Sequence, residues 1–193
     1  MFINDIVAGV IDRVDRLRHE VNDTWQIPRV EGELLHHLAL SMNARLIVEV
    51  GTSYGFSSLF WADAMARSGG HVHTIDMDPK KFAASREHFR AAGLDRFVTN
   101  HLGNALELLP SVPDNIDLAF LDADKSQTQQ YLDAVWPKLR EGGSVLIDNA
   151  TTHREQLAPC LQALRARTDA SVIEVEVGNG LIWAIKTAQG SAR

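Results

Sequence analysis

The sequence has one cysteine, Cys160, and no long apolar run. A single cysteine excludes a disulfide within the chain and is typical of proteins in a reducing compartment, so we expect a cytoplasmic protein. A membrane-spanning helix needs about 18 consecutive apolar residues, and no stretch approaches that length. The N-terminal stretch carries acids early and lacks a basic segment followed by a long apolar one. The sequence therefore predicts neither a membrane anchor nor a secretory signal.

An excess of positive charge is also missing. The chain has 19 Lys and Arg against 25 Asp and Glu, which gives a net charge of −6 and a pI of about 5.7. Binding of nucleic-acid phosphates needs a basic field, and no run of Lys or Arg is present. We therefore expect a small-molecule partner rather than a nucleic acid. The length of 193 residues, 45% of them hydrophobic, suits one domain with a sizeable core.

Hydrophobic periodicity predicts two N-terminal helices, at 3–21 and 31–43, and then alternating strands and helices. Strands are expected at 46–50, 72–76, 96–101, 116–121, 144–148, 171–177 and 181–187. Helices are expected between them at 56–68, 79–92, 104–109, 126–139 and 153–167.

This alternation predicts an α/β fold with a mostly parallel seven-stranded sheet and helices on both faces. The last two strands are separated by "GNG", a hairpin signal, so the sheet ends in an antiparallel pair. We expect one domain over residues 1–193, with a helical appendage at 1–44 and an α/β core at 45–187. In such sheets ligands bind at the carboxyl ends of the strands.

The first strand–turn–helix segment reads "EVGTSYGFSS". A triphosphate loop would need Gly-Lys-Ser/Thr, and the turn has no lysine. A dinucleotide loop would need a middle glycine, and Ser53 stands in its place. S-adenosylmethionine (SAM) has no phosphate, and its positively charged methionine end favours an acid at the strand end, where Glu49 stands. Two glycines in a strand–helix turn are also compatible with simple packing.

The next two strand ends favour an adenosine. The second strand ends in "TIDMDP", where Asp76 is placed to bind both ribose hydroxyls and Asp78 to cap the next helix. The third strand is followed by "GNAL", where small residues at 103–105 leave room for adenine. Three consecutive turns thus suit an adenosine ligand without phosphates.

Two further strands end in polar groups. "FLDADK" brings Asp122, Asp124 and Lys125 to the end of an apolar strand, and "SVLIDN" ends at Asp148 and Asn149. Such groups form either a solvated turn or a site. Because parallel strands end at the same edge of a sheet, a site would combine both segments.

Taken together, these segments resemble the cation-dependent O-methyltransferases, the family of catechol and caffeoyl-CoA O-methyltransferases. The resemblance runs from "PRVEGELL" to "GNGLIWAIK" and rests on "EVGTSYGFSS", "TIDMDP", "GNAL", "DADK" and "DN" in this order. It implies the Rossmann-like class I methyltransferase fold and SAM as the methyl donor.

The resemblance also implies roles for individual residues. The ligands of Mg²⁺ or another divalent cation would be Asp122, Asp148 and Asn149, and the catalytic residues would be Lys125 and Asp122. SAM would be bound by Glu49, Gly51, Thr52, Ser53, Tyr54, Gly55, Ser57, Asp76, Met77, Asn104, Ala105, Asp122 and Asp124.

The expected reaction is methyl transfer from SAM to a hydroxyl of a small, catechol-like acceptor with vicinal oxygens. A cation that chelates both oxygens would favour ionisation of the hydroxyl, and Lys125 would take its proton. A short connection after Asn149 departs from family members that act on bulky acyl-CoA esters, so the acceptor stays open. Methylation of a hydroxylated tRNA base and a silent SAM-binding module are the alternatives. The family also suggests a homodimer.

Several other residues have ambiguous roles. Trp25 is a hypothetical cover of the site, and His153 either lines the pocket or begins a helix. His71 and His73 would share one strand face, but without a third ligand nearby a structural role is favoured over a metal site.

Overall fold

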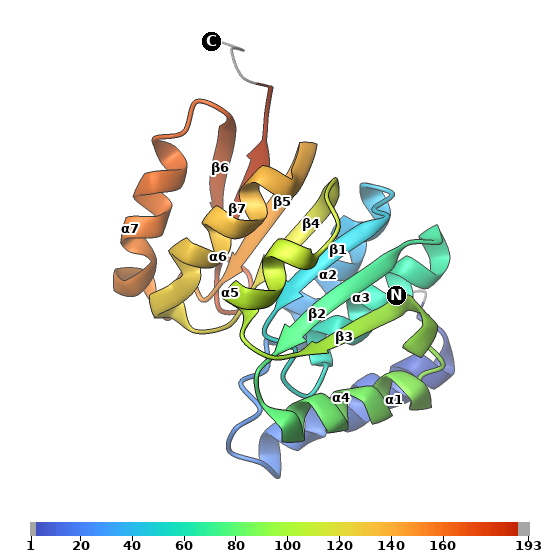
Figure 1. The fold of residues 1–193 in the computed structure, drawn as a ribbon. Coiled ribbons are helices and arrows are strands. Elements are labelled where there is room, and N and C mark those ends of the chain that lie inside the picture. Colours follow the sequence, from blue (N-terminus) through green and yellow to red (C-terminus); the bar gives the residue numbers. More distant parts are fainter. Residues whose placement is uncertain (1–2, 189–193) are drawn as a thin grey trace.

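The computed structural model describes residues 3–188 and contains a seven-stranded sheet in the order β3-β2-β1-β4-β5-β7-β6 (Figure 1). The first five strands are parallel, and β7 runs antiparallel to both β5 and β6. The strands are β1 (Leu46–Val50), β2 (His71–Asp76), β3 (Val98–Leu102), β4 (Ile116–Leu121), β5 (Leu139–Asp148), β6 (Ala170–Val175) and β7 (Leu181–Lys186). This arrangement confirms the predicted mostly parallel sheet with an antiparallel C-terminal pair.

Helices cover both faces of the sheet (Figure 1). They are α1 (Asp5–Arg16), α2 (Arg29–Ser41), α3 (Phe56–Ser68), α4 (Pro79–Ala91), α5 (Ala105–Leu108), α6 (Thr128–Val135) and α7 (Arg154–Arg165). Residues of α1 to α4 form one apolar core with Ile47 and Phe120, and α5 to α7 form a second with Val48 and Val50. Neighbouring residues of one strand thus enter opposite cores, as the alternation of side chains along a strand requires. No helix within residues 3–188 is long and apolar enough to cross a membrane.

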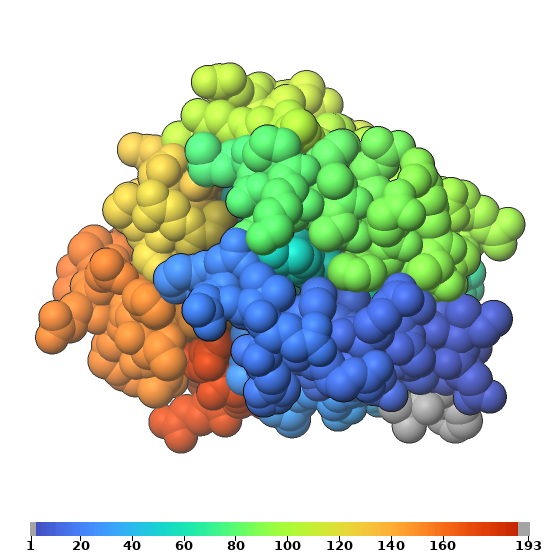
Figure 2. Space-filling model, turned by 90° about the horizontal axis from the view of Figure 1, so that it is seen from below, coloured from blue at the N-terminus to red at the C-terminus, as the bar shows by residue number. Residues whose placement is uncertain are grey.

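The N-terminal helices belong to the first core, although the sequence suggested an appendage. Val7, Ile11 and Val14 of α1 and Leu35 of α2 are fully buried in the same cluster as α3. The apolar stripe of α1 is therefore covered within this chain. In Figure 2 the N-terminal residues, in blue, form a continuous band between α4 (green) and α7 (orange).

Strand β5 begins earlier than predicted. The sequence suggests a helix to residue 139 and a Gly-Gly turn before a strand at 144, but α6 ends at Val135 and β5 starts at Leu139. Pro137 cannot supply a helical N–H, and Arg140 is held by an ion pair of 2.5 Å to Asp117 of β4. The ladder to β4 shifts register here, which accommodates the two glycines.

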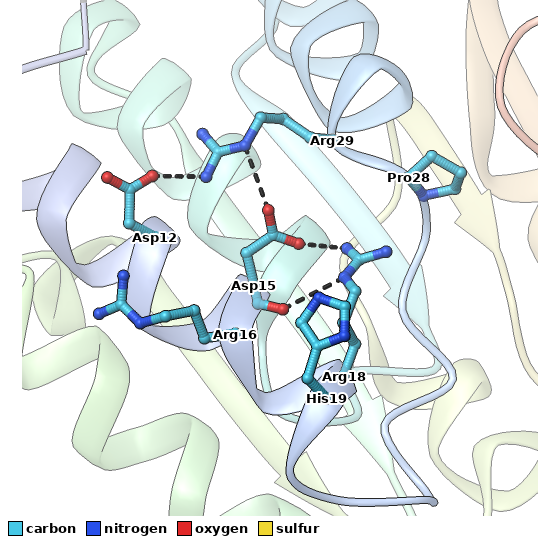
Figure 3. Close-up of a pocket in the computed structure, with 7 residues that line it drawn as sticks. All are labelled: Asp12, Asp15, Arg16, Arg18, His19, Pro28 and Arg29. Carbon is cyan, nitrogen blue, oxygen red and sulfur yellow. Dashed lines mark hydrogen bonds and ion pairs between the residues drawn. The ribbon is translucent and has the colours of Figure 1, made fainter.

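A network of ion pairs fixes the start of α2 (Figure 3). The guanidinium of Arg29 contacts Asp12 at 2.5 Å and Asp15 at 3.3 Å, and Arg18 contacts Asp15 as well. These groups line a surface hollow of about 450 Å³ away from the strand ends. Because Asp12 and Asp15 pair with Arg18 and Arg29, we interpret this hollow as a clamp between α1 and α2.

Three histidines share the face of β2 and β3 that is turned away from α4. The rings of His73 and His101 stack with centroids 5.3 Å apart, and His71 meets His73 edge-on at the same distance. His101 is the third histidine that the sequence analysis did not connect with His71 and His73. Burial lowers the pKa of all three, and the neighbouring rings lower that of His73 further, to about 4.

This cluster should make the protein less stable in mild acid. In the unfolded chain a histidine takes up a proton near pH 6.5, whereas His73 in the folded state resists it down to about pH 4. The unfolded state therefore binds more protons between these values, and stability falls as the pH falls, by up to about 1.4 kcal/mol per pH unit for one group. Urea unfolding at pH 7.5 and pH 5 should show a smaller loss for His73→Gln than for the unchanged protein. The exposed His37 supplies the control His37→Gln, and equal losses in all three proteins would refute the prediction.

Candidate functional site

Two adjacent cavities, of about 530 and 160 Å³, open at the carboxyl ends of the parallel strands. They share Gly51, Asp76, Ala123 and Asp124, so one elongated ligand can occupy both. The larger cavity is lined by Trp25, Gln26, Gly51, Ser53, Asp76, Lys81, Asp122, Ala123, Asp124, Lys125, Asn149, His153, Gln156 and Asn179. The site thus lies where the sequence analysis expected it.

Gly51 brings two strand ends into contact. Its φ is +106°, and a Cβ at this position would overlap the carbonyl oxygen of Asp122. The N–H of Asp122 in turn donates to the carbonyl of Val50 at 2.9 Å. Only glycine accepts this backbone conformation with so little space. The turn after β1 and the turn after β4 are therefore held at a fixed separation.

Ser53 connects the first turn with two other parts of the site. Its N–H donates to Asp76 Oδ2 at 2.6 Å, and its hydroxyl donates to the carbonyl of Thr24 at 2.5 Å. Asp76 Oδ1 accepts a further bond of 2.9 Å from the N–H of Asp78, which also caps α4 as predicted. The carboxylate of Asp76 is thus held in place, and each of its oxygens keeps a second lone pair for a ligand.

The smaller cavity lies beside Asp76 and has mixed polar and apolar walls. Predicted residues that line it are Met77, Asn104 and Ala105, and the side chain of Asn104 also caps α5. Gln127 and Tyr131 line it from the side of α6. The sequence analysis missed these two because they belong to the helix after "DADK" and carry no motif of their own.

Five of the predicted cofactor residues lie outside both cavity walls. The clearest is Glu49, which is fully buried: Ser57 donates to Oε1 and Thr74 to Oε2 at 2.6 Å each, and Ser58 also bonds to Oε2. Burial raises the pKa of Glu49, and the hydroxyls partly oppose that shift. Glu49 therefore has hydroxyl partners within the protein, and its contact with the methionine end of SAM stays a prediction. Thr52, Tyr54, Gly55 and Ser57 also do not line either cavity, and their contacts with SAM likewise stay predictions.

The stretch "DADK" contains both a site and a turn. The ammonium of Lys125 contacts Asp122 Oδ1 at 2.8 Å, and both side chains are nearly buried in the wall of the larger cavity. Asp124 is exposed and accepts bonds of 2.8 to 2.9 Å from Ser126 and Gln127, which lower its pKa. Asp122 and Lys125 therefore form an ion pair in the cavity wall, and Asp124 forms hydrogen bonds within the turn.

The end of β5 is held by the loop between β6 and β7. Asn149 has a left-handed φ of +70° and lines the cavity, while Asp148 lies beneath it with 1% exposure. The N–H of Ala150 donates to Gly180 at 2.9 Å, and the N–H of Thr151 donates to Asn179 at 3.0 Å. The "GNG" segment, predicted only as a hairpin, therefore also supports the polar end of β5.

Glu31 is an acid at this site that the sequence analysis missed. It comes from the first turn of α2, is fully buried, and accepts a bond of 3.2 Å from the N–H of Asn179. Burial, followed by the carboxyl group of Asp148, raises the pKa of Glu31 far above its ordinary range. Burial also raises the pKa of Asp122, although Lys125 opposes the shift. The site is thus crowded with carboxyl groups.

These residues fit a divalent cation. The Oε1 of Glu31 and the Oδ1 of Asp148 are buried and accept no hydrogen bond from the residues between 3 and 188. Asp122, Asp148 and Asn149 would supply oxygen ligands, the type that Mg²⁺ prefers. Within the same described range, no three His, Cys, Asp or Glu side chains already have the arrangement of a metal site. The predicted ligands are two carboxylates, Asp122 and Asp148, and the amide of Asn149, so they do not form such a group of three.

The remaining cavity wall comes from the N-terminal segment and α7. Trp25 has a positive φ of +50° and is 77% exposed at the cavity. His153 stands both at the N-terminus of α7 and in the cavity wall, so both readings of it apply. Gln26, Lys81 and Gln156 complete this side, and the sequence offered no signal for them.

Comparisons with known proteins show the family of this chain. A family model described as "Methyltransferase domain" matches residues 48–150. A catechol O-methyltransferase of Mycobacterium tuberculosis is 32% identical over 134 residues, which is 66% of this chain and 60% of that protein. A putative O-methyltransferase of Mycolicibacterium smegmatis is 35% identical over 147 residues, or 75% of this chain and 67% of that protein.

A solved structure has the same fold. The O-methyltransferase TomG from Streptomyces achromogenes, in complex with SAM, is 25% identical with a TM-score of 0.80 over 96% of this chain and 91% of that one. This chain belongs to the methyltransferase-domain family, among the class I O-methyltransferases related to catechol and caffeoyl-CoA O-methyltransferases.

Proposed function

We propose that this protein transfers a methyl group from SAM to a hydroxyl of a small acceptor with vicinal oxygens, with the help of a divalent cation. The observation that carries the proposal is the ion pair of Asp122 and Lys125, which lines one cavity together with Asn149 and Asp76. Asp148, the residue before Asn149, is buried. Along this wall the ribose hydroxyls would find an acceptor in Asp76, and the cation would find oxygen ligands. The hydroxyl of the methyl acceptor would find a base in Lys125.

SAM would extend across both cavities. Asp76 would accept hydrogen bonds from the ribose, and Met77, Asn104 and Ala105 would surround the adenine in the smaller cavity. The methionine end would lie toward Gly51 and Ser53 in the larger one. The absence of phosphate-binding groups from the first turn supports SAM over a nucleotide cofactor.

The acceptor would lie beside Lys125. In the reaction the bond between the methyl carbon and the SAM sulfur breaks as a bond to the acceptor oxygen forms, and the hydroxyl proton must leave. Lys125 Nζ is proposed to take that proton as a neutral amine, after its ammonium has released a proton to solvent. Asp122, Asp148 and Asn149 would hold the cation, which when bound supplies positive charge that favours ionisation of the hydroxyl.

The walls favour a small polar acceptor. Gln26, His153, Gln156 and Asn179 offer hydrogen bonds, and Trp25 offers one flat aromatic surface at the same cavity. The chain spans about 60% of the length of the catechol O-methyltransferase it matches, so the acceptor is not carried over from that relative. We further propose a homodimer from the family resemblance, which light scattering would test.

The test is transfer of labelled methyl from SAM to catechols, flavonoids and hydroxylated tRNA, with Mg²⁺ and with EDTA. We expect transfer to a catechol with Mg²⁺ and a loss of at least about 100-fold with EDTA, because the ionising charge and the orientation are both removed. Transfer that resists EDTA would refute the cation requirement. Transfer to tRNA alone would refute the small-molecule acceptor.

A further inference from the structure

Glu31 is a charged group that the proposed mechanism does not use. Its side chain is completely buried although it belongs to α2, outside the alternating strands and helices that build the rest of the site. It lies against Asp148, and the Arg29 clamp two residues earlier holds this end of α2 to α1. A buried acid needs a donor or a positive charge nearby.

The two oxygens of Glu31 differ in their surroundings. Oε2 accepts the bond of 3.2 Å from the N–H of Asn179. It also fills the space beside Gly178, where a Cβ would overlap it and where φ is +57°. Oε1 receives no donor from the residues between 3 and 188, and neither does Asp148 Oδ1. Two neighbouring buried carboxyl oxygens therefore have only each other for a partner among the described residues.

The nearby positive charge is already engaged. The ammonium of Lys125 contacts Asp122, which leaves the pair of Glu31 and Asp148 without a cationic partner among the contacts of the described residues. Two neighbouring carboxylates repel each other. A divalent cation that binds an oxygen of each replaces this repulsion by attraction, so such a pair favours cation binding.

We propose that Glu31 is an additional oxygen ligand of the divalent cation, supplied by α2 and paired with Asp148. The inference rests on the proposed cation dependence and extends its ligand set. Glu31 would join Asp122, Asp148 and Asn149, although no three His, Cys, Asp or Glu side chains of the described residues have the arrangement of a metal site without the cation. Mg²⁺ commonly keeps several waters, so the other positions need no protein group.

A purely structural role for Glu31 makes a different prediction. In that case Glu31 only supports the "GNG" loop through Asn179, and a neutral amide would serve equally well. Glu31→Gln keeps an oxygen for the N–H of Asn179 and can donate to Asp148, but it removes the negative charge. This substitution therefore separates support of the loop from binding of the cation.

The experiment is a calorimetric titration of Mn²⁺ and, separately, of SAM into the unchanged protein, Glu31→Gln and the control Glu33→Gln. Glu33 lies on the same helix and is only partly buried. We expect Mn²⁺ affinity to fall by about 10- to 100-fold in Glu31→Gln and to stay unchanged in Glu33→Gln. SAM affinity without the cation should be the same in all three proteins.

Each outcome bears on one proposal. Equal Mn²⁺ affinity in Glu31→Gln and the unchanged protein would overturn the role of Glu31. Failure of the unchanged protein to bind Mn²⁺ would instead refute the proposed cation dependence. If Glu31→Gln does not fold, Glu31→Asp keeps the charge on a shorter side chain. Its Mn²⁺ affinity should then be weakened while its SAM affinity is kept, and unchanged Mn²⁺ affinity would overturn the proposal.

Discussion

Lys125→Arg should lower kcat for methyl transfer by about 10²- to 10⁴-fold and leave SAM affinity unchanged. Lys125 contacts Asp122 at 2.8 Å in the wall of the acceptor cavity. Arginine can keep that ion pair, but it stays protonated at any pH at which the protein is folded, so it cannot take up the proton of an acceptor hydroxyl. The loss of rate would therefore report on the base and not on the ion pair. Single-turnover rates with saturating SAM and Mg²⁺ measure it.

Two further variants sharpen this result. Lys125→Met removes both the base and the ion pair, so its rate should be no higher than that of Lys125→Arg, and its stability should be lower because Asp122 loses a partner in a largely buried place. Lys80→Met is the control, because Lys80 is an exposed lysine outside the cavity wall, and its rate should stay within about twofold. A Lys125→Arg protein with nearly native kcat would show that the residue acts through its charge alone.

The ends of the parallel strands were predictable because several independent signals coincide there. In β4 the apolar stretch 118–121 stops at Asp122. Strand β1, apolar except for Glu49, is followed by Gly51, whose positive φ suits no other residue so well. Polar groups and glycines at such points mark the edge where ligands bind. At the start of β5 the local sequence signals did not coincide in this way, because Gly142 and Gly143 are typical of a turn and the strand already begins at Leu139. Pairing with β4 overrides that local preference.

The face of β1 on which the Glu49 side chain lies also follows from the sequence. Side chains alternate along a strand, so Glu49 shares a face with Ile47, which belongs to the core beneath α1 to α3. Val48 and Val50 point to the opposite core. The alternation therefore predicts that the side chain of Glu49 lies on the face of α1 to α3, while its contact with SAM stays a prediction.

Glu31 could not be recognised in the same way. An acid in the first turn of a helix is common, since it compensates the helix dipole at the N-terminus. Nothing local marks Glu31 as buried. Its burial depends on Asn179, which is 148 positions away in the sequence. Contacts of this kind follow from the packing of α2 against the C-terminal hairpin, and a single sequence carries no sign of them.

Gly51→Ala should abolish SAM binding and lower the free energy of unfolding by about 2 to 6 kcal/mol. A φ of +106° strains an alanine, which costs about 1 to 3 kcal/mol. The new Cβ would overlap the carbonyl oxygen of Asp122, and relief of such overpacking costs a similar amount. Any shift that relieves the overlap separates the turn after β1 from the turn after β4. Urea unfolding and a SAM titration measure the two effects.

Two other glycines separate these causes. Gly93 has a positive φ of +69° but open space around a Cβ, so Gly93→Ala should cost only the strain, about 1 to 2 kcal/mol. Gly9 lies within α1 with the same open space, and Gly9→Ala should stabilise the protein by about 0.5 to 1 kcal/mol. Both variants should bind SAM normally. If Gly51→Ala lost no more stability than Gly93→Ala and still bound SAM, close contact between the two turns would not be needed to form the cofactor site.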